Sequence, residues 1–143
     1  MSPMQKRERG FTLIELITVM IIVSIMAVTL FSRIGSVNSA NLQAGRDDLI
    51  AALFFAQQTA MARSNIQLII TASTVSVNEN GTPIKVHAQG YPLNFPSGIT
   101  ATPLVLTYDK LGRTGSAAAN TIVLSATGGL SASITLEASG YAY

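Results

Sequence analysis

The chain has 143 residues, a net charge of +2 and no cysteine. Its length allows one domain of modest size besides any membrane segment. The lack of cysteine excludes a disulfide framework, a thiolate metal site, a cysteine nucleophile and attachment of lipid to a cysteine. Charged residues make up only 11% of the chain, against roughly 25% in ordinary soluble proteins. The composition therefore indicates a long apolar segment.

The first ten residues hold much of the positive charge. They contain Lys6, Arg7 and Arg9 together with one acid, Glu8. Without these three bases and this acid, the 9 basic and 7 acidic side chains of the whole chain fall to six of each, so no net charge is left. Basic residues ahead of an apolar run hold that end in the cytoplasm. The positive charge is therefore a topology signal and not a nucleic-acid signal.

Residues 11–31 form an apolar run with a single charge, Glu15. A run of about 20 apolar residues can cross a bilayer as one helix. A secretory signal has a shorter apolar region of about 7–15 residues, so it is not favoured. A carboxylate deep in such a run costs roughly 2.5 kcal/mol or more if it is unpaired. A helix that only anchored a domain would have no use for Glu15, which indicates a specific role.

The residues Gly-Phe-Thr-Leu-Ile-Glu-Leu at 10–16, behind a short basic segment, resemble the class III leader of type IV pilins and type II secretion pseudopilins. The resemblance implies that a prepilin peptidase cuts between Gly10 and Phe11 and that Phe11 is then N-methylated. It also implies that Glu15 pairs with the N-terminal amine of a neighbouring subunit. The partners would be other pilins, met through the N-terminal helix.

Physical chemistry agrees with this assignment. Cleavage would create an ammonium at Phe11, and a carboxylate paired with an ammonium is far less costly in hydrocarbon than one left alone. Each subunit would carry a donor and an acceptor displaced along its helix, and such a heterologous contact propagates into an open filament. The alternative is a plain signal anchor in which Glu15 has no role.

A second helical stretch follows the apolar run. Residues 32–41 are small and polar and include Gly35, which allows either a weakened helix or a short break. From residue 40 to about 63 the spacing of apolar residues predicts an amphipathic helix that packs on a sheet. Its buried stripe is predicted to contain Leu42, Leu49, Leu53, Ala56 and Ala60, widened by Ile50, Phe54 and Met61, with Phe54 and Phe55 both in the core.

After Asn65 the apolar period changes to that of strands. Asn80-Gly81 is a strong hairpin signal, and it predicts that Thr74–Glu79 pairs with 84–88. Five or six short strands are expected in all, and the others are 66–72, 104–108, 121–126 and 133–138, with a turn at Gly128-Gly129. The division is thus a leader at 1–10, a membrane helix at 11–31, a periplasmic amphipathic helix at 32–65 and a sheet domain at 66–143.

A long N-terminal helix followed by an antiparallel sheet is an α+β arrangement, and it is similar to the pilin fold. The later region resembles minor pilins and pseudopilins of the GspH/FimT type through Phe95-Pro96-Ser97-Gly98, the segment 106–113 and the final Ala138-Ser139-Gly140. The Ser/Thr/Ala-rich domain also resembles minor pilins of MSHA pili. The implied location is the bacterial inner membrane, with the C-terminal domain in the periplasm, and then a pilus or pseudopilus.

No stretch carries the residues of an enzyme. The only histidine is His87, and the acids Asp47, Asp48, Glu79, Asp109 and Glu137 are scattered. Asp47 and Asp48 point about 100° apart on a helix and form no acid–base pair. Gly128-Gly129 lacks the lysine of a phosphate loop. No catalytic residue, cofactor or metal site is predicted.

A role in DNA uptake would need several bases that converge on phosphates. After Arg63 only Lys85, Lys110 and Arg113 remain, so DNA binding is not favoured. The leading interpretation is a minor pilin or pseudopilin, a structural subunit that enters or primes a type IV pilus, and the resemblance to MSHA minor pilins implies a pilus of the MSHA type. The alternatives are a GspH-like pseudopilin of a type II secretion system and a membrane-anchored minor pilin that binds DNA or a glycan.

Overall fold

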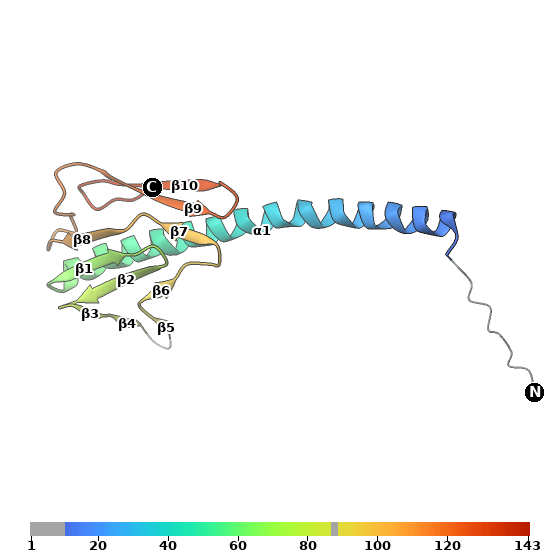
Figure 1. Ribbon diagram of the computed structural model, residues 1–143. Helices are drawn as coiled ribbons and strands as arrows, with labels where there is room; N and C mark the ends of the chain where they lie inside the picture. The colour runs from blue at the N-terminus through green and yellow to red at the C-terminus, as the bar shows by residue number, and fades with distance from the viewer. Residues whose placement is uncertain (1–10, 87–88) are drawn as a thin grey trace, which may run out of the picture. The chain divides into compact units, whose positions relative to one another are not determined.

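A computed structural model describes residues 11–86 and 89–143, and for residues 31–36, 86 and 89 it gives the backbone alone. The chain divides into two compact units, Met1–Gly35 and Ser36–Tyr143, which are described separately. The helix α1 runs from Leu13 to Ala62 (Figure 1). The sequence left a break near Gly35 open, and the helix has none there.

Three residues with positive φ shape the turn after α1 and the first hairpin. Asn65 has φ 57°, and the hairpin residues Asn80 and Gly81 have φ 51° and 81°. Two successive positive φ values define a type I′ turn, which suits asparagine followed by glycine. The Asn65 side-chain amide donates a hydrogen bond of 2.8 Å to the Asn80 side-chain oxygen. The predicted Asn80-Gly81 turn is therefore present and is tied to the end of the helix.

The larger sheet has five strands, with β3, β2, β1 and β8 in that order and β6 also paired with β2. Leu68 in the central strand lies opposite Val77 on one side and Leu106 on the other, in antiparallel pairs. The pairing of β1 with β8 joins segments far apart in sequence. The bounds are β1 Ile66–Ile70, β2 Thr74–Glu79, β3 Thr82–Pro83, β6 Leu93–Asn94 and β8 Leu104–Tyr108.

The predicted partner of β2 is wrong in its position. Residues 84–88 were expected, but β3 is Thr82–Pro83, and of the expected segment Ile84 donates to the Val77 carbonyl at 2.9 Å. Proline has no N–H to continue a ladder and belongs on an edge. The chain then turns away, so that β4 Lys85–Val86 pairs with β5 Gln89–Gly90. The start of β2 pairs with β6 instead.

A second sheet contains β10, β9 and β7 in that order. Its strands are β7 Ile99–Ala101, β9 Asn120–Ala126 and β10 Ser131–Leu136. The last strand begins and ends two residues before the predicted 133–138, because the Gly128-Gly129 turn closes at once and Ala126 N–H donates to the Leu130 carbonyl at 2.7 Å. The described residues form ten strands and not five or six, since several have only two or three residues.

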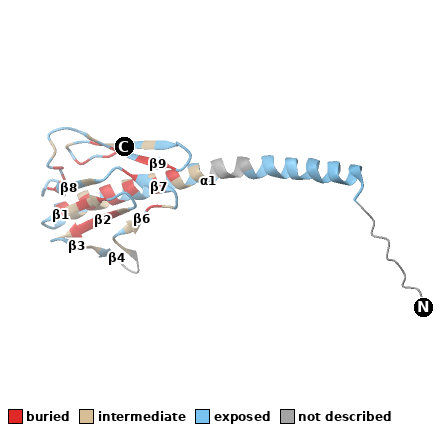
Figure 2. Ribbon diagram, viewed as in Figure 1, coloured by how far each residue is buried: buried red, intermediate tan, exposed pale blue. Residues whose placement is uncertain are grey.

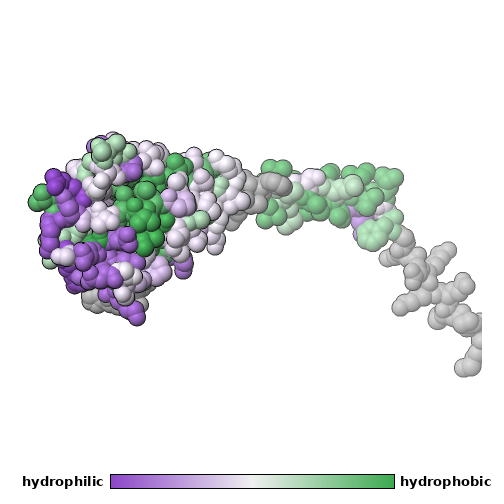
Figure 3. Space-filling model, turned by 60° about the vertical axis from the view of Figure 1, so that its left-hand side comes forward, coloured by the Kyte–Doolittle hydropathy of each residue, from purple (hydrophilic) through white to green (hydrophobic). Residues whose placement is uncertain are grey.

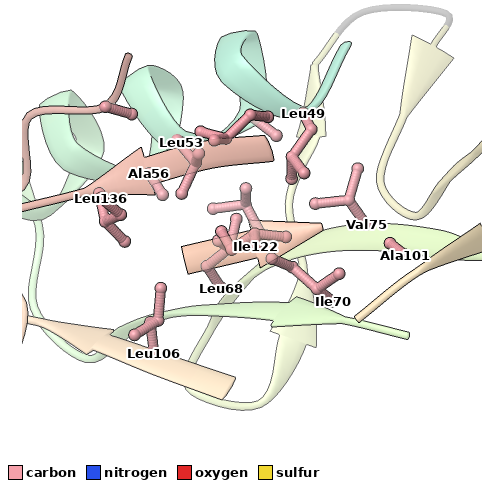
Figure 4. Close-up of a cluster of buried hydrophobic side chains, with 14 of the residues drawn as sticks. Leu49, Leu53, Ala56, Leu68, Ile70, Val75, Ala101, Leu106, Ile122 and Leu136 are labelled. Carbon is pink, nitrogen blue, oxygen red and sulfur yellow. The ribbon is translucent and has the colours of Figure 1, made fainter. Parts of the chain in front are cut away.

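The core of the unit Ser36–Tyr143 lies between one face of α1 and both sheets (Figure 2, Figure 4). All five helix residues predicted at the centre of the stripe are buried. They face buried side chains of β1, β2, β8, β9 and β10. The largest fully buried residues are Leu49, Leu53, Ile66, Leu68, Ile70, Val75, Val77, Ile122, Leu124, Ile134 and Leu136. This α+β packing confirms the expected fold class.

The predicted width of the helix stripe is wrong on one side. Phe54 is 37% exposed and Met61 is 53% exposed. Phe55 is half-buried against the core and stacks on Tyr91, with ring centroids 5.5 Å apart. Each helical residue turns about 100° from the one before, so two adjacent phenylalanines do not both point at the sheets. Phe54 instead meets Tyr141 edge-to-face, with centroids 6.4 Å apart.

Tyr108 at the end of β8 is 5% exposed, and its hydroxyl has no hydrogen-bond partner among the described residues. Burial raises the pKa of this phenol. A buried hydroxyl without a partner costs roughly 1–3 kcal/mol. We expect the free energy of unfolding of Tyr108→Phe to equal that of the parent or to exceed it by up to about 1 kcal/mol. The variant should therefore unfold at an equal or higher urea concentration. A clear loss of stability in the same titration would show that the hydroxyl is hydrogen-bonded.

Candidate assembly site at the N-terminal helix

The first turn of α1 holds the backbone of Glu15. Thr12 precedes the helix, and its hydroxyl oxygen accepts a hydrogen bond of 3.3 Å from the Glu15 N–H. The Thr12 carbonyl accepts from Glu15 and Leu16 at 3.1 and 3.2 Å. Threonine followed three residues later by glutamate is a capping-box sequence. Thr12 was not recognised as a functional residue from the sequence, although this spacing is a signal that could have found it.

Glu15 is exposed, and its carboxylate has no hydrogen bond or ion pair within residues 11–86 and 89–143. A carboxylate in the first turn gains about 0.3–1 kcal/mol from the helix dipole. The cost of that charge at membrane depth is roughly 2.5 kcal/mol or more. At that depth the dipole therefore does not offset the cost of an unpaired charge.

The rest of the segment is suited to hydrocarbon. Leu13–Leu30 is 18 residues long and apolar enough to cross a membrane by length and composition, which corresponds to about 27 Å of helix. Its hydroxyl groups bond back to their own helix: Thr18 to the Ile14 carbonyl at 2.7 Å and Ser24 to the Met20 carbonyl at 2.7 Å. Such bonds satisfy these donors without water.

Hydrophobic side chains cover most of the visible face of this part of α1 (Figure 3). Every residue from 11 to 30 is exposed. Phe11 at its start is 80% exposed. A helix that is apolar all round is stable only when lipid or other protein covers it. This segment is therefore suited to being covered by lipid or by other protein.

The remaining candidates from the sequence do not come together. Gly10 and His87 lie outside the described residues. Asp47 and Asp48 are exposed on α1. Glu79 does not stand alone, because its carboxylate accepts from Arg63 at 2.9 Å. Among the described residues no three His, Cys, Asp or Glu side chains are grouped in a way that could hold a metal ion.

Asp109 and Arg113 form a closed turn. The Asp109 carboxylate accepts from the Arg113 backbone N–H at 2.9 Å, from the Arg113 side-chain Nε at 2.8 Å and from the Leu111 N–H at 2.9 Å. The hydrogen bonds from Arg113, the backbone one first, lower the pKa of this carboxyl. Arg113 and Lys110 are the two bases of this turn that could contact a phosphate. Because Arg113 is paired with Asp109, the two side chains do not form a strong basic patch.

A cleft of about 550 Å³ lies between the last turns of α1 and β3–β4. Phe55, Thr59 and Ile84 form much of its wall, and Arg63 and Lys85 stand at its edge. Arg63 is held by Glu79, so Lys85 is the one cation of this lining without an ion pair to a described residue. Among the described residues that line this cleft, no nucleophile is paired with a base.

Residues 5–31 match the model of the prokaryotic N-terminal methylation motif. No curated protein matches the chain. Among solved structures, the chain is similar to the type IV minor pilin FimU of Pseudomonas aeruginosa, with a TM-score of 0.53 and 16% identity over 71% of this chain and 90% of that one. The pilin fold expected from the sequence is confirmed. The chain thus resembles prokaryotic proteins with an N-terminal methylation motif in residues 5–31 and a type IV minor pilin in its fold.

Proposed function

We propose that the chain is a minor pilin or pseudopilin, a structural subunit that is built into a type IV pilus or primes its assembly. The observation that carries this proposal is the carboxylate of Glu15, which lies in the first turn of an uncovered apolar helix and has no partner among the described residues. The match of residues 5–31 to the methylation motif supports it, and the similarity to FimU favours a minor subunit.

In this function Gly10–Phe11 is the processing site and Glu15 is the assembly residue. A prepilin peptidase cuts the peptide bond between Gly10 and Phe11, and Phe11 becomes an N-methylated terminus. Its ammonium then pairs with the Glu15 carboxylate of the neighbouring subunit. Before assembly the helix holds the chain in the inner membrane with the domain from Ser36 in the periplasm, because the basic leader stays in the cytoplasm.

The processing step predicts the mass of the mature protein. We expect intact-protein mass spectrometry to give a chain that begins at Phe11 with one added methyl group. A Gly10→Leu variant should keep its full length, because a bulky side chain replaces the glycine at the cleavage site. A mature N-terminus at any other residue would contradict the assignment of Gly10 and Phe11.

The second candidate is a GspH-like pseudopilin of a type II secretion system. It would insert and assemble through the same apolar helix and the same Glu15 carboxylate. The Ser/Thr/Ala-rich domain favours a pilus of the MSHA type over that candidate. Incorporation distinguishes them: the chain should co-purify with sheared surface pili and not with secretion-system filaments in the periplasm. DNA binding is not favoured, since Arg113 is already paired with Asp109 at 2.7 Å.

A further inference from the structure

The outer face of the sheet β10-β9-β7 is covered with hydroxyl groups. In these strands alternate residues point inward to the core, as Ile122, Leu124 and Ile134 do. Strand alternation places the residues between them on the opposite face. The outward residues are Thr100 of β7, Thr121, Val123 and Ser125 of β9, and Ser131, Ser133 and Thr135 of β10.

The pairing register arranges these hydroxyls in rows across the strands. Thr100 lies opposite Ser125, and Ser125 lies opposite Ser131. A second row pairs Thr121 with Thr135. Neighbouring strands are about 4.8 Å apart and alternate residues about 6.7 Å apart, so the face is a regular array of hydroxyl groups.

The C-terminal tail extends this array as a further strand. Thr135 and Tyr143 exchange two backbone hydrogen bonds of 2.9 and 3.0 Å, and Glu137 N–H donates to the Tyr141 carbonyl at 2.8 Å. Ala142 between the tyrosines is buried. Tyr143 lies opposite the outward Thr135, and the Tyr141 ring also packs edge-to-face on Phe54 of α1, so the two tyrosine rings lie at the edge of this face. They are 55% and 54% exposed and stack with centroids 5.9 Å apart. Backbone pairing thus holds two exposed aromatic rings beside the hydroxyl rows.

The chemistry of this hydroxyl face points to an uncharged partner. From Thr114 to Tyr143 the chain has one charged side chain, Glu137. The hydroxyls of Thr121, Ser125, Ser131, Ser133 and Thr135 have no hydrogen-bond partner in the part of the chain that the structure describes. Each hydroxyl can donate one hydrogen bond and accept others. With no base on the face, the phosphates of nucleic acids or lipid headgroups would find nothing to neutralise them.

We infer that the hydroxyl face, made by β7, β9, β10 and the tail 141–143, binds a neutral polysaccharide. Sugar hydroxyls match the free donors and acceptors of the rows. The Glu137 carboxylate, which accepts from the Tyr143 hydroxyl at 3.5 Å, is a further acceptor at their end. The apolar C–H faces of sugar rings match Tyr141 and Tyr143, since an aromatic face carries partial negative charge. Because the strands and the tail are all held by backbone pairing, little order has to be gained on binding.

The test is retention of the full chain, in detergent micelles, on cellulose, chitin and starch. We expect retention on at least one of these polymers and none on polygalacturonate or single-stranded DNA. Ser133→Glu, which places a charge and bulk at the centre of the face, should reduce the retained fraction at least tenfold. Thr107→Glu makes the same change at an exposed position of β8 in the other sheet and should change nothing.

Tyr143→Ala provides a second measurement, because it removes an exposed ring and leaves the backbone pairing with β10 in place. It should lower retention severalfold with an unchanged urea midpoint. The inference is overturned by absence of retention on all three neutral polymers, by preferential retention on DNA or polygalacturonate, or by equal loss in Thr107→Glu. The measurement uses purified protein and does not depend on filament assembly, so it is independent of the function proposed above.

Discussion

Glu15→Leu should leave the protein in the membrane and remove it from filaments. Insertion should be equal or better, because a charge that costs roughly 2.5 kcal/mol or more is taken out of the apolar run. The helix start is retained, since Thr12 accepts from the backbone N–H of residue 15 and not from its side chain. Assembly would leave the ammonium of a neighbouring Phe11 buried without its partner.

Removal of one member of a buried ion pair costs about 3–5 kcal/mol, so the fraction found in sheared filaments should fall more than tenfold. Quantitative immunoblots of membrane and filament fractions measure both effects. Glu15→Gln, which has a similar shape without charge, should behave like Glu15→Leu.

Thr18→Leu is the matched control, one turn further on, where the hydroxyl bonds only to its own helix. It should insert and assemble as the parent does. Normal incorporation of both Glu15 variants would mean that the carboxylate does not pair between subunits. Loss of Thr18→Leu as well would point to a general effect of apolar substitutions on helix packing.

The candidate site could be predicted from the sequence because its parts are neighbours in the chain. The site spans six residues, from Gly10 through Phe11 to Glu15. The apolar run that follows can be recognised from its composition alone. The buried stripe of α1 and the Asn80-Gly81 turn are also local, since helix period and turn chemistry depend on a few adjacent residues. These features needed no knowledge of what packs against them.

The features that could not be predicted depend on distant segments. The residues near β1 do not indicate that β8 will pair with it. The residues near β2 likewise do not indicate that β6 will pair with its start, where the sequence predicted residues 84–88. From the sequence Phe54 is predicted to be a core residue, but in the structure it contacts Tyr141 of the C-terminal tail. The hydroxyl face is hidden for the same reason: Thr100, Ser125 and Ser131 become one row only through strand register.

Leu53→Ala should destabilise the unit Ser36–Tyr143 by about 3–5 kcal/mol, the range found when a fully buried leucine leaves a cavity. Leu53 is 0% exposed and points from α1 at the sheets (Figure 4).

Alanine is a slightly better helix former than leucine, so helix propensity alone would make Leu53→Ala slightly more stable. The expected loss of stability therefore comes from lost packing in the core. A domain has only about 5–15 kcal/mol of stability in all. The variant should therefore unfold at a far lower urea concentration.

The chain itself offers a probe for this measurement. It has no tryptophan and four tyrosines, at 91, 108, 141 and 143, all within Ser36–Tyr143. Tyrosine fluorescence of the full chain in detergent thus follows this unit without a signal from the membrane segment. Met61→Ala is the control on the same helix, and because Met61 is 53% exposed its effect should stay below about 1 kcal/mol. Equal losses in the two variants would mean that the helix face at Leu53 is not the one that packs on the sheets.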